Sequence, residues 1–151
     1  MATQKLLPVG KGKLGYTTSN TFKQPLKKVW EAVTQAKHLQ KYFVDKMKGE
    51  FGPELKPVAW HWKKYGDMPI TVTRYEEGKL LELLMPTMDG KYRTTVIFEF
   101  VRKGNISIFR IHDKGYKPTD LKLAFMTCEG WTEFHTCMKA YLTHGVDLRK
   151  G

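Results

Sequence analysis

The sequence contains little cysteine and no long apolar run. Its two cysteines, Cys128 and Cys137, are nine positions apart, which on a helix places them about 180° apart around the axis. They can then neither form a disulfide nor bind one metal together, and we expect free thiols, as in a reducing compartment. No apolar run approaches the roughly 18 residues of a membrane span, and residues 6–9 are too short for a signal-peptide core. These absences predict a cytoplasmic protein with no membrane span.

Clusters of basic residues are also missing. Lys and Arg number 26 against 15 Asp and Glu, and the formal net charge is +11, so this is a basic protein. The lysines are scattered, and no run of five basic residues occurs. A surface that binds nucleic acid gathers its basic residues on one face. The favoured interpretation is therefore a dispersed, solvated charge, and nucleic acid is not an expected partner.

Common catalytic motifs are missing too. The sequence has no Gly-x-Ser-x-Gly, no glycine-rich phosphate loop and no His-Glu-x-x-His. Glu129 and Glu133 have i, i+4 spacing, but they fall on the solvent side of the last helix described below. We therefore predict no catalytic residue, no metal ligand and no cofactor, and we expect a binding protein rather than an enzyme.

The length and composition are those of one globular domain. The chain has 151 residues, of which 41% are hydrophobic, and a chain of this length can bury a core of its own. Residues 1–15 contain four glycines or prolines and show no clear period, which predicts a flexible N-terminal arm. Residues 16–151 are expected to form a single domain.

The first part of this domain is predicted to contain one strand and two short helices. Residues 16–22 are rich in β-formers and indicate a strand. Pro25 suits the first position of a helix, where its missing N–H would have no partner. The next apolar residues have the i, i+3, i+4, i+7 spacing of one helical face: Leu26, Val29, Trp30 and Val33. A second short helix is expected around Leu39, Tyr42 and Phe43.

Residues 44–115 consist of short β-rich segments separated by turn signals. Alternation of side chains, with turns at Glu77-Gly78 and around Gly104, predicts antiparallel strands at 58–62, 70–75, 80–85, 94–101 and 106–112. If Phe109 and Ile111 face the core, Arg110 faces outward. A shift of one residue would reverse both assignments and favour an anionic ligand. The other side chains expected to face inward are Val58, Trp60, Trp62, Leu81, Leu83, Phe98 and Phe100.

The last predicted helix is long and has one apolar face. Pro118 begins it and Gly145 is a suitable C-cap, so it spans about 25 residues, or near 38 Å. Phe134 and Tyr141 are expected to flank the apolar face, and Cys137 is expected to lie away from it. Such a helix needs a wide surface, which a curved antiparallel sheet of six or seven strands provides, so the fold class is α+β. The face itself carries Ala124, Cys128, Trp131, His135, Met138 and Leu142.

Three parts of the sequence resemble one superfamily. Residues 25–33 (PLKKVWEAV) resemble the first helix of START-like (Bet v-like) proteins, also called SRPBCC proteins. Residues 130–145, with Gly-Trp-Thr-Glu-Phe at their start, resemble the end of the branch named for the activator of the 90-kDa heat-shock protein ATPase, and residues 113–116 resemble its segment before the last helix. The resemblance covers residues 16–148 and implies a helix-grip fold: two short helices after the first strand, and a long C-terminal helix over the concave face of the sheet. Residues 49–66 depart from the glycine-rich strand common in the family.

The helix-grip fold implies a ligand pocket between the sheet and the last helix. Trp60 and Trp62 share one face of their strand, and they either line this pocket with Trp131 or fill a core. His135 is the polar residue on the apolar helix face. It is either a ligand-binding or acid–base group, or a buried histidine hydrogen-bonded to a strand. The predicted pocket residues are Trp60, Trp62, Leu83, Met85, Phe98, Phe109, Trp131, His135 and Met138.

Four functions are compatible with these observations. The favoured one is binding of a hydrophobic, aromatic or lipid-like small molecule, which the apolar residues around Trp131 would surround. The resemblance implies a second, in which the protein contacts a chaperone and regulates its ATPase. A cyclase- or hydrolase-like enzyme using His135 is the third. Binding of nucleic acid is the fourth and rests on net charge alone.

Overall fold

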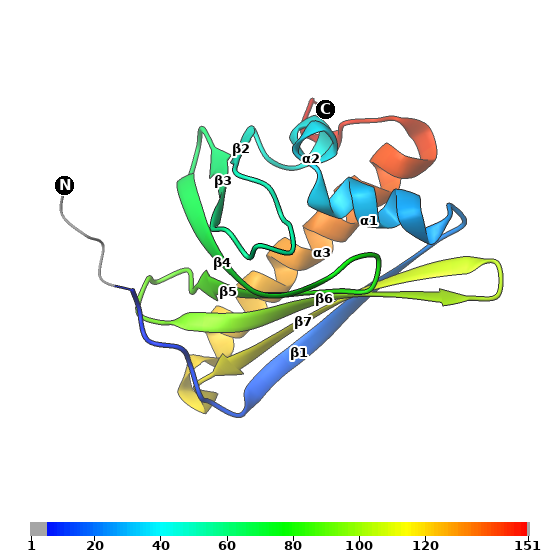
Figure 1. The fold of residues 1–151 in the computed structure, drawn as a ribbon. Coiled ribbons are helices and arrows are strands. Elements are labelled where there is room, and N and C mark those ends of the chain that lie inside the picture. Colours follow the sequence, from blue (N-terminus) through cyan, green and yellow to red (C-terminus); the bar gives the residue numbers. More distant parts are fainter. Residues whose placement is uncertain (1–5, 151) are drawn as a thin grey trace.

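The structure is a computed structural model that describes residues 6–150 (Figure 1). Seven strands form one antiparallel sheet in the order β1-β7-β6-β5-β4-β3-β2, and three α-helices complete the domain. The elements are β1 (Leu14–Phe22), α1 (Leu26–Thr34), α2 (Ala36–Tyr42), β2 (Lys46–Lys48), β3 (Val58–Trp62), β4 (Gly66–Glu76), β5 (Leu80–Pro86), β6 (Arg93–Lys103), β7 (Ile106–Tyr116) and α3 (Leu121–His144), with 3-10 turns η1 (Pro118–Asp120) and η2 (Leu148–Lys150) on either side of α3.

The predicted helix-grip architecture is confirmed. The sheet curves around α3, and α1 and α2 lie together near the C-terminal end of α3 (Figure 1). β1 pairs with β7, with Thr18 opposite Ile111, so the first and last strands are neighbours. None of the helices within residues 6–150 is long and apolar enough to cross a membrane.

The segment before β1 lies against the ends of β6 and β7. The N–H of Gly10 donates to the carbonyl of Arg93 at 2.7 Å, and the N–H of Gly12 donates to the carbonyl of Gly115 at 3.2 Å. Glycine is required for this approach, because a Cβ on Gly12 would lie 1.8 Å from the carbonyl oxygen of Tyr116. This part of the predicted arm is thus hydrogen-bonded to the sheet, whereas residues 1–5 lie outside the described residues.

The predicted strands are confirmed, and their predicted inward side chains are buried except that of Trp62, which is half-buried. Phe109 and Ile111 are fully buried, and Arg110 lies on the outer face, where its Nη1 is 3.1 Å from Oε1 of Glu99. The short strand β2 was not predicted. It contains only three residues with one buried side chain, Met47, and it forms by pairing with β3. The inward faces of β5 and β6 carry the buried residues Leu81, Leu83, Met85, Val96, Phe98 and Phe100.

The buried face of α3 is wider than predicted. Trp131, His135 and Met138 are buried as expected, but Cys137, which was predicted to lie away from this face, is buried as well, and Phe134 is fully buried. The reason is that α3 packs against β1 and also against α2 and α1, so neighbours cover it on more than one side. Burial raises the pKa of the Cys137 thiol. Cys128 and Leu142, which were expected within the apolar face, are only half-buried, and Ala124 is buried.

Candidate ligand site

The predicted pocket residues gather between the sheet and α3. Eight of the nine are buried, and Trp62 is half-buried. The ring centroid of Trp60 lies 6.1 Å from that of Trp62, 6.5 Å from Phe98 and 6.3 Å from Trp131, and the rings of Phe98 and Phe109 are 5.5 Å apart. The rings pack directly against one another. The remaining apolar members of the same cluster are Leu83, Met85 and Met138.

Two further aromatic residues belong to this cluster. Phe134 stacks on Trp60 with centroids 6.1 Å apart and an interplanar angle of 13°. The ring centroid of Phe43, at the end of α2, lies 5.8 Å from that of Trp60 and 5.5 Å from that of Trp62. The spacing of Phe134 three residues after Trp131 is a helical signal that could have assigned it. Phe43 lies at a helix end, where no periodicity fixes the direction of a side chain. We call these rings, together with Trp60, Trp62, Phe98, Phe109 and Trp131, the aromatic cluster.

The indole N–H of Trp60 is buried and has no acceptor among the described residues. The indole of Trp62 donates to the carbonyl of Phe43 at 2.8 Å, and that of Trp131 donates to Oδ2 of Asp113 at 3.2 Å. A buried donor without a partner costs about 1–3 kcal/mol. Trp60 therefore presents an unpaired hydrogen-bond donor inside an otherwise apolar cluster.

Asp113 is a buried carboxylate that was not predicted to lie in the interior. Its Oδ2 accepts hydrogen bonds from the hydroxyls of Tyr16 at 2.9 Å and Tyr116 at 2.8 Å, besides the indole of Trp131. Burial raises the pKa of Asp113, although these hydrogen bonds oppose the effect. The same burial, with the neighbouring carboxylate, raises the pKa of Tyr16 and Tyr116. Alternate residues of a strand face the same side, so the inward positions of Phe109 and Ile111 also predict an inward position for residue 113. Its contacts join β1, β7 and α3.

His135 is packed at the edge of the cluster. Its Nε2 lies 2.9 Å from Oγ1 of Thr18, its ring is 5.2 Å from that of Phe109, and its Nδ1 is buried with no partner among residues 6–150. Burial lowers the pKa of His135 to about 4, so the ring is neutral at physiological pH. The ring is thus packed and hydrogen-bonded to a strand side chain, and it also borders the second cavity described below.

Two cavities open beside this core. The first, of about 930 Å³, lies between α1, the loop after β2 and the turn that follows β4. The second, of about 680 Å³, lies between β1 and α3 and includes His135 in its lining. The first cavity is lined by Leu26, Lys27, Trp30, Glu31, Thr34, Gln35, Ala36, Lys37, Glu50, Phe51, Tyr75, Glu77 and Gly78.

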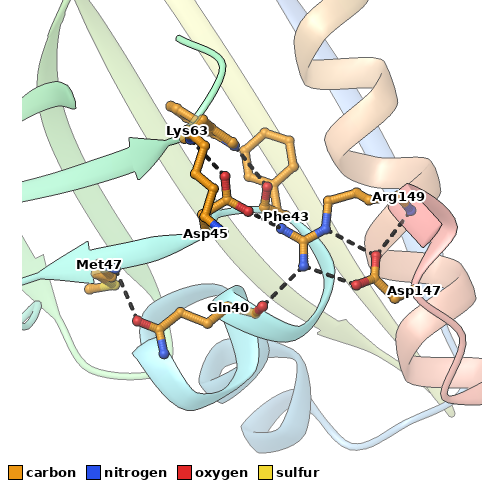
Figure 2. A network of polar contacts seen from close by, with 8 residues as sticks. Gln40, Phe43, Asp45, Met47, Lys63, Asp147 and Arg149 are labelled. Atoms are coloured by element: carbon orange, nitrogen blue, oxygen red, sulfur yellow. Dashed lines mark hydrogen bonds and ion pairs between the residues drawn. The ribbon is translucent and has the colours of Figure 1, made fainter. Parts of the chain in front are cut away.

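The C-terminal segment closes over the connection between α2 and β2 (Figure 2). Arg149 donates to both carboxylate oxygens of Asp147, at 3.0 and 2.9 Å, and to the carbonyl of Gln40 at 3.0 Å. It also lies 3.6 Å from Asp45. This connection carries Phe43, one of the two half-buried rings of the aromatic cluster.

Comparison with known families gives one match. The sequence model of the family described as "Activator of Hsp90 ATPase homolog 1-like protein" matches residues 23–143. That range runs from the residue after β1 to the last turn of α3 and contains every predicted pocket residue. A search of curated proteins finds no match to this sequence.

Solved structures share the fold at low sequence identity. A Staphylococcus saprophyticus protein is 20% identical with a TM-score of 0.77, over 90% of this chain and 96% of that one. The Aha1 dimer from Colwellia psychrerythraea is 15% identical with a TM-score of 0.69, over 91% of this chain and 99% of that one. DynU16, described as a putative protein in the dynemicin biosynthetic locus, is 16% identical with a TM-score of 0.74, over 87% of this chain and 48% of that one. These likenesses show a common fold.

Proposed function

The chain belongs to the family of Activator of Hsp90 ATPase homolog 1-like proteins, and we propose that it binds a hydrophobic or aromatic small molecule between the sheet and α3. The observation that carries this proposal is the unpaired indole N–H of Trp60 inside the aromatic cluster. A ligand placed there would exchange apolar contacts with the surrounding rings and would supply the missing acceptor.

The surroundings of Trp60 define the chemistry of the ligand. Flat rings at stacking and edge distances, Phe98, Phe134 and Trp131, suit a planar apolar body. One donor among them suits a single acceptor, such as a ketone or ether oxygen. Phe43 and Trp62 are only half-buried, so we infer that they form the movable wall through which the ligand enters.

A pair of planar probes tests this proposal. Fluorenone carries a carbonyl acceptor, and fluorene has a closely similar tricyclic skeleton without it. We expect fluorenone to bind about 5- to 30-fold more tightly, because one hydrogen bond to a buried donor contributes about 1–2 kcal/mol. The measurement is quenching of tryptophan fluorescence together with the thermal shift.

Trp60→Phe is the decisive variant because it keeps an aromatic ring and removes the N–H. We expect it to bind both probes equally. The matched control is Tyr92→Phe, which removes a buried phenol that donates to Asp120 at 2.7 Å outside the cluster and should keep the preference for fluorenone. Wild-type protein that binds neither probe, or a preference that survives in Trp60→Phe, would contradict the proposal.

Contact with a chaperone is a second candidate, favoured by the family description and by one surface. Near its start, α3 exposes three apolar side chains, with exposed fractions of 46% for Leu121, 65% for Phe125 and 46% for Met126. Exposed apolar groups on one helix suit a protein partner. The ATPase rate of a 90-kDa heat-shock chaperone, measured with wild-type protein and with Phe125→Asp, tests this. An unchanged rate with wild-type protein, or equal stimulation by both proteins, would exclude contact through this surface.

A further inference from the structure

The first cavity combines an aromatic floor with a charged rim. Trp30 and Phe51 contribute buried rings, with exposed fractions of 6% and 8%, and Tyr75 lies edge-on to Trp30 with centroids 5.5 Å apart. Leu26 extends the apolar surface along α1. The volume of about 930 Å³ lies within the range of cavities that hold small molecules.

Three glutamates reach this cavity from separate parts of the chain. Glu31 comes from α1, Glu50 from the loop after β2, and Glu77 from the turn after β4. Glu77 is also close enough to Tyr75 to contribute, after burial, to the raised pKa of that phenol. Lys27 and Lys37 line the rim as well, and Nζ of Lys27 lies 4.0 Å from Oε1 of Glu31, so the cavity carries a formal charge of −1. In a chain with a net charge of +11, this is a locally acidic site.

The carboxylates do not form a metal site. Within residues 6–150, no group of three or more acidic, histidine or cysteine side chains converges closely enough to hold a metal ion. Small inorganic cations also need several oxygen ligands and hold their water strongly, which an aromatic floor does not replace. Separated carboxylates around stacked rings match a larger cation whose charge is diffuse, since aromatic faces attract such cations and apolar surface accepts their carbon atoms.

We propose that the first cavity binds an amphipathic organic amine in its protonated form. The ammonium group lies against Tyr75 and Trp30 with the glutamates around it, and the apolar body lies along Leu26 and Phe51. Gln35 lines the same cavity, and its Oε1 is buried without a donor among the described residues. Because this oxygen is covered in the structure, the Gln35 side chain must turn before an ammonium N–H can donate to it. The site is separate from Trp60 and does not depend on the function proposed above.

Three compounds with one skeleton test the charge preference by calorimetry. They are 4-phenylbutylamine, which is cationic at pH 7, the neutral 4-phenyl-1-butanol, and the anionic 4-phenylbutanoate. We expect the amine to bind at least about 10-fold more tightly than the acid, because carboxylates attract one and repel the other. Its affinity should fall as salt is added. Equal binding of the amine and the acid, or no binding of the amine, would overturn the proposal.

Matched variants locate the site. Glu31→Gln combined with Glu77→Gln should weaken amine binding about 10-fold and leave binding of the alcohol unchanged, whereas Glu129→Gln, at an exposed position on α3, should have no effect. Tyr75→Leu removes an aromatic face, and its control is Tyr65→Leu, whose side chain is 73% exposed outside the cavity. Far-UV circular dichroism checks that each variant is folded. If a cavity variant and its control lose amine binding equally, the location is wrong. Trp60→Phe should not change amine binding.

Discussion

At the scale of single residues, the neutral ring of His135 links stability to pH. Its pKa is lowered to about 4 by burial, against about 6.5 in an unfolded chain. Between these values the unfolded state binds more protons, so the free energy of unfolding rises with pH from 4 to 6.5. The contribution of His135 is about 3 kcal/mol, present above pH 6.5 and lost as the pH falls to about 4.

Replacement of His135 by Gln should therefore flatten this pH dependence. Gln keeps a polar group near Thr18 and does not titrate. Urea unfolding at pH 4, 5 and 7 measures the slope. His112→Gln is the control, because His112 lies on the outer face, where its Nδ1 is 2.8 Å from Oγ1 of Thr17. A slope that remains as steep in His135→Gln as in the wild type would show that other groups carry the linkage, among them His38, whose pKa is also lowered by burial.

The contribution of Asp113 to the pH dependence of stability should have the opposite sign. Because burial raises its pKa in the folded state, the folded protein holds this proton more strongly than the unfolded chain does. The resulting stabilisation is fully present below the unfolded pKa and is lost as the pH rises through the folded pKa. We expect Asp113→Asn to lose stability relative to the wild type at low pH, and this difference to shrink as the pH rises. Urea unfolding at several pH values measures this, and a difference in unfolding free energy that stays constant with pH would contradict the prediction.

The interior residues differ in how far the sequence could identify them. Trp60, Phe98 and Trp131 were assigned correctly, because strand alternation and helical spacing fix the direction of a large apolar side chain. Asp113 occupies an inward position by the same alternation, but a carboxylate is rarely buried. Its burial depends on hydroxyls of Tyr16 and Tyr116 that meet only in the folded sheet. Long-range donors of this kind leave no local pattern.

At the scale of the elements, Arg149 fixes the connection that follows α2. It joins η2 to Asp147, the carbonyl of Gln40 and Asp45 (Figure 2). Arg149→Met removes these contacts while keeping much of the apolar stem. We expect a loss of about 1–2 kcal/mol, more than an exposed ion pair contributes, and faster amide hydrogen exchange in residues 43–48. The control is Arg74→Met, since the pair of Arg74 with Glu76 is exposed on both sides. Equal exchange in both variants would show that Arg149 does not hold the connection.

The elements that the sequence predicted are those with a repeating signal. β5, β6 and β7 have long alternating patterns, and α1 has four apolar residues on one face. β2 has no such pattern, because a strand of three residues has one inward side chain and depends on β3 for its pairing. The face of α3 was assigned with Cys137 outside it, because a helical wheel treats the partner as one flat surface. Packing of α3 against α2 and α1 as well as β1 buries a second side of this helix.

At the scale of the whole molecule, one hydrophobic cluster connects the three helices with the sheet. It runs from Phe22 in β1 through Val29 in α1 and Leu39 in α2 to Met138 in α3. β1 pairs with β7, joining residues far apart in the sequence. β1 has β7 as its only strand partner within the described residues, and α3 packs mainly on β1, so loss of β7 would expose both. We therefore expect residues 16–151 to unfold as one cooperative unit.

The tryptophans make this cooperativity measurable. Trp30, Trp60, Trp62 and Trp131 lie in α1, β3 and α3, so their fluorescence reports packing across the molecule, while far-UV circular dichroism reports the backbone. The two urea transitions should coincide within error, and refolding should be slow for a chain of this size, in milliseconds to seconds, because the sheet is built from distant pairings. A fluorescence transition at clearly lower urea than the circular dichroism transition would mean that α3 or the helix pair detaches first. The expected single cooperative transition would then be wrong, because parts of one domain would open at different free energies.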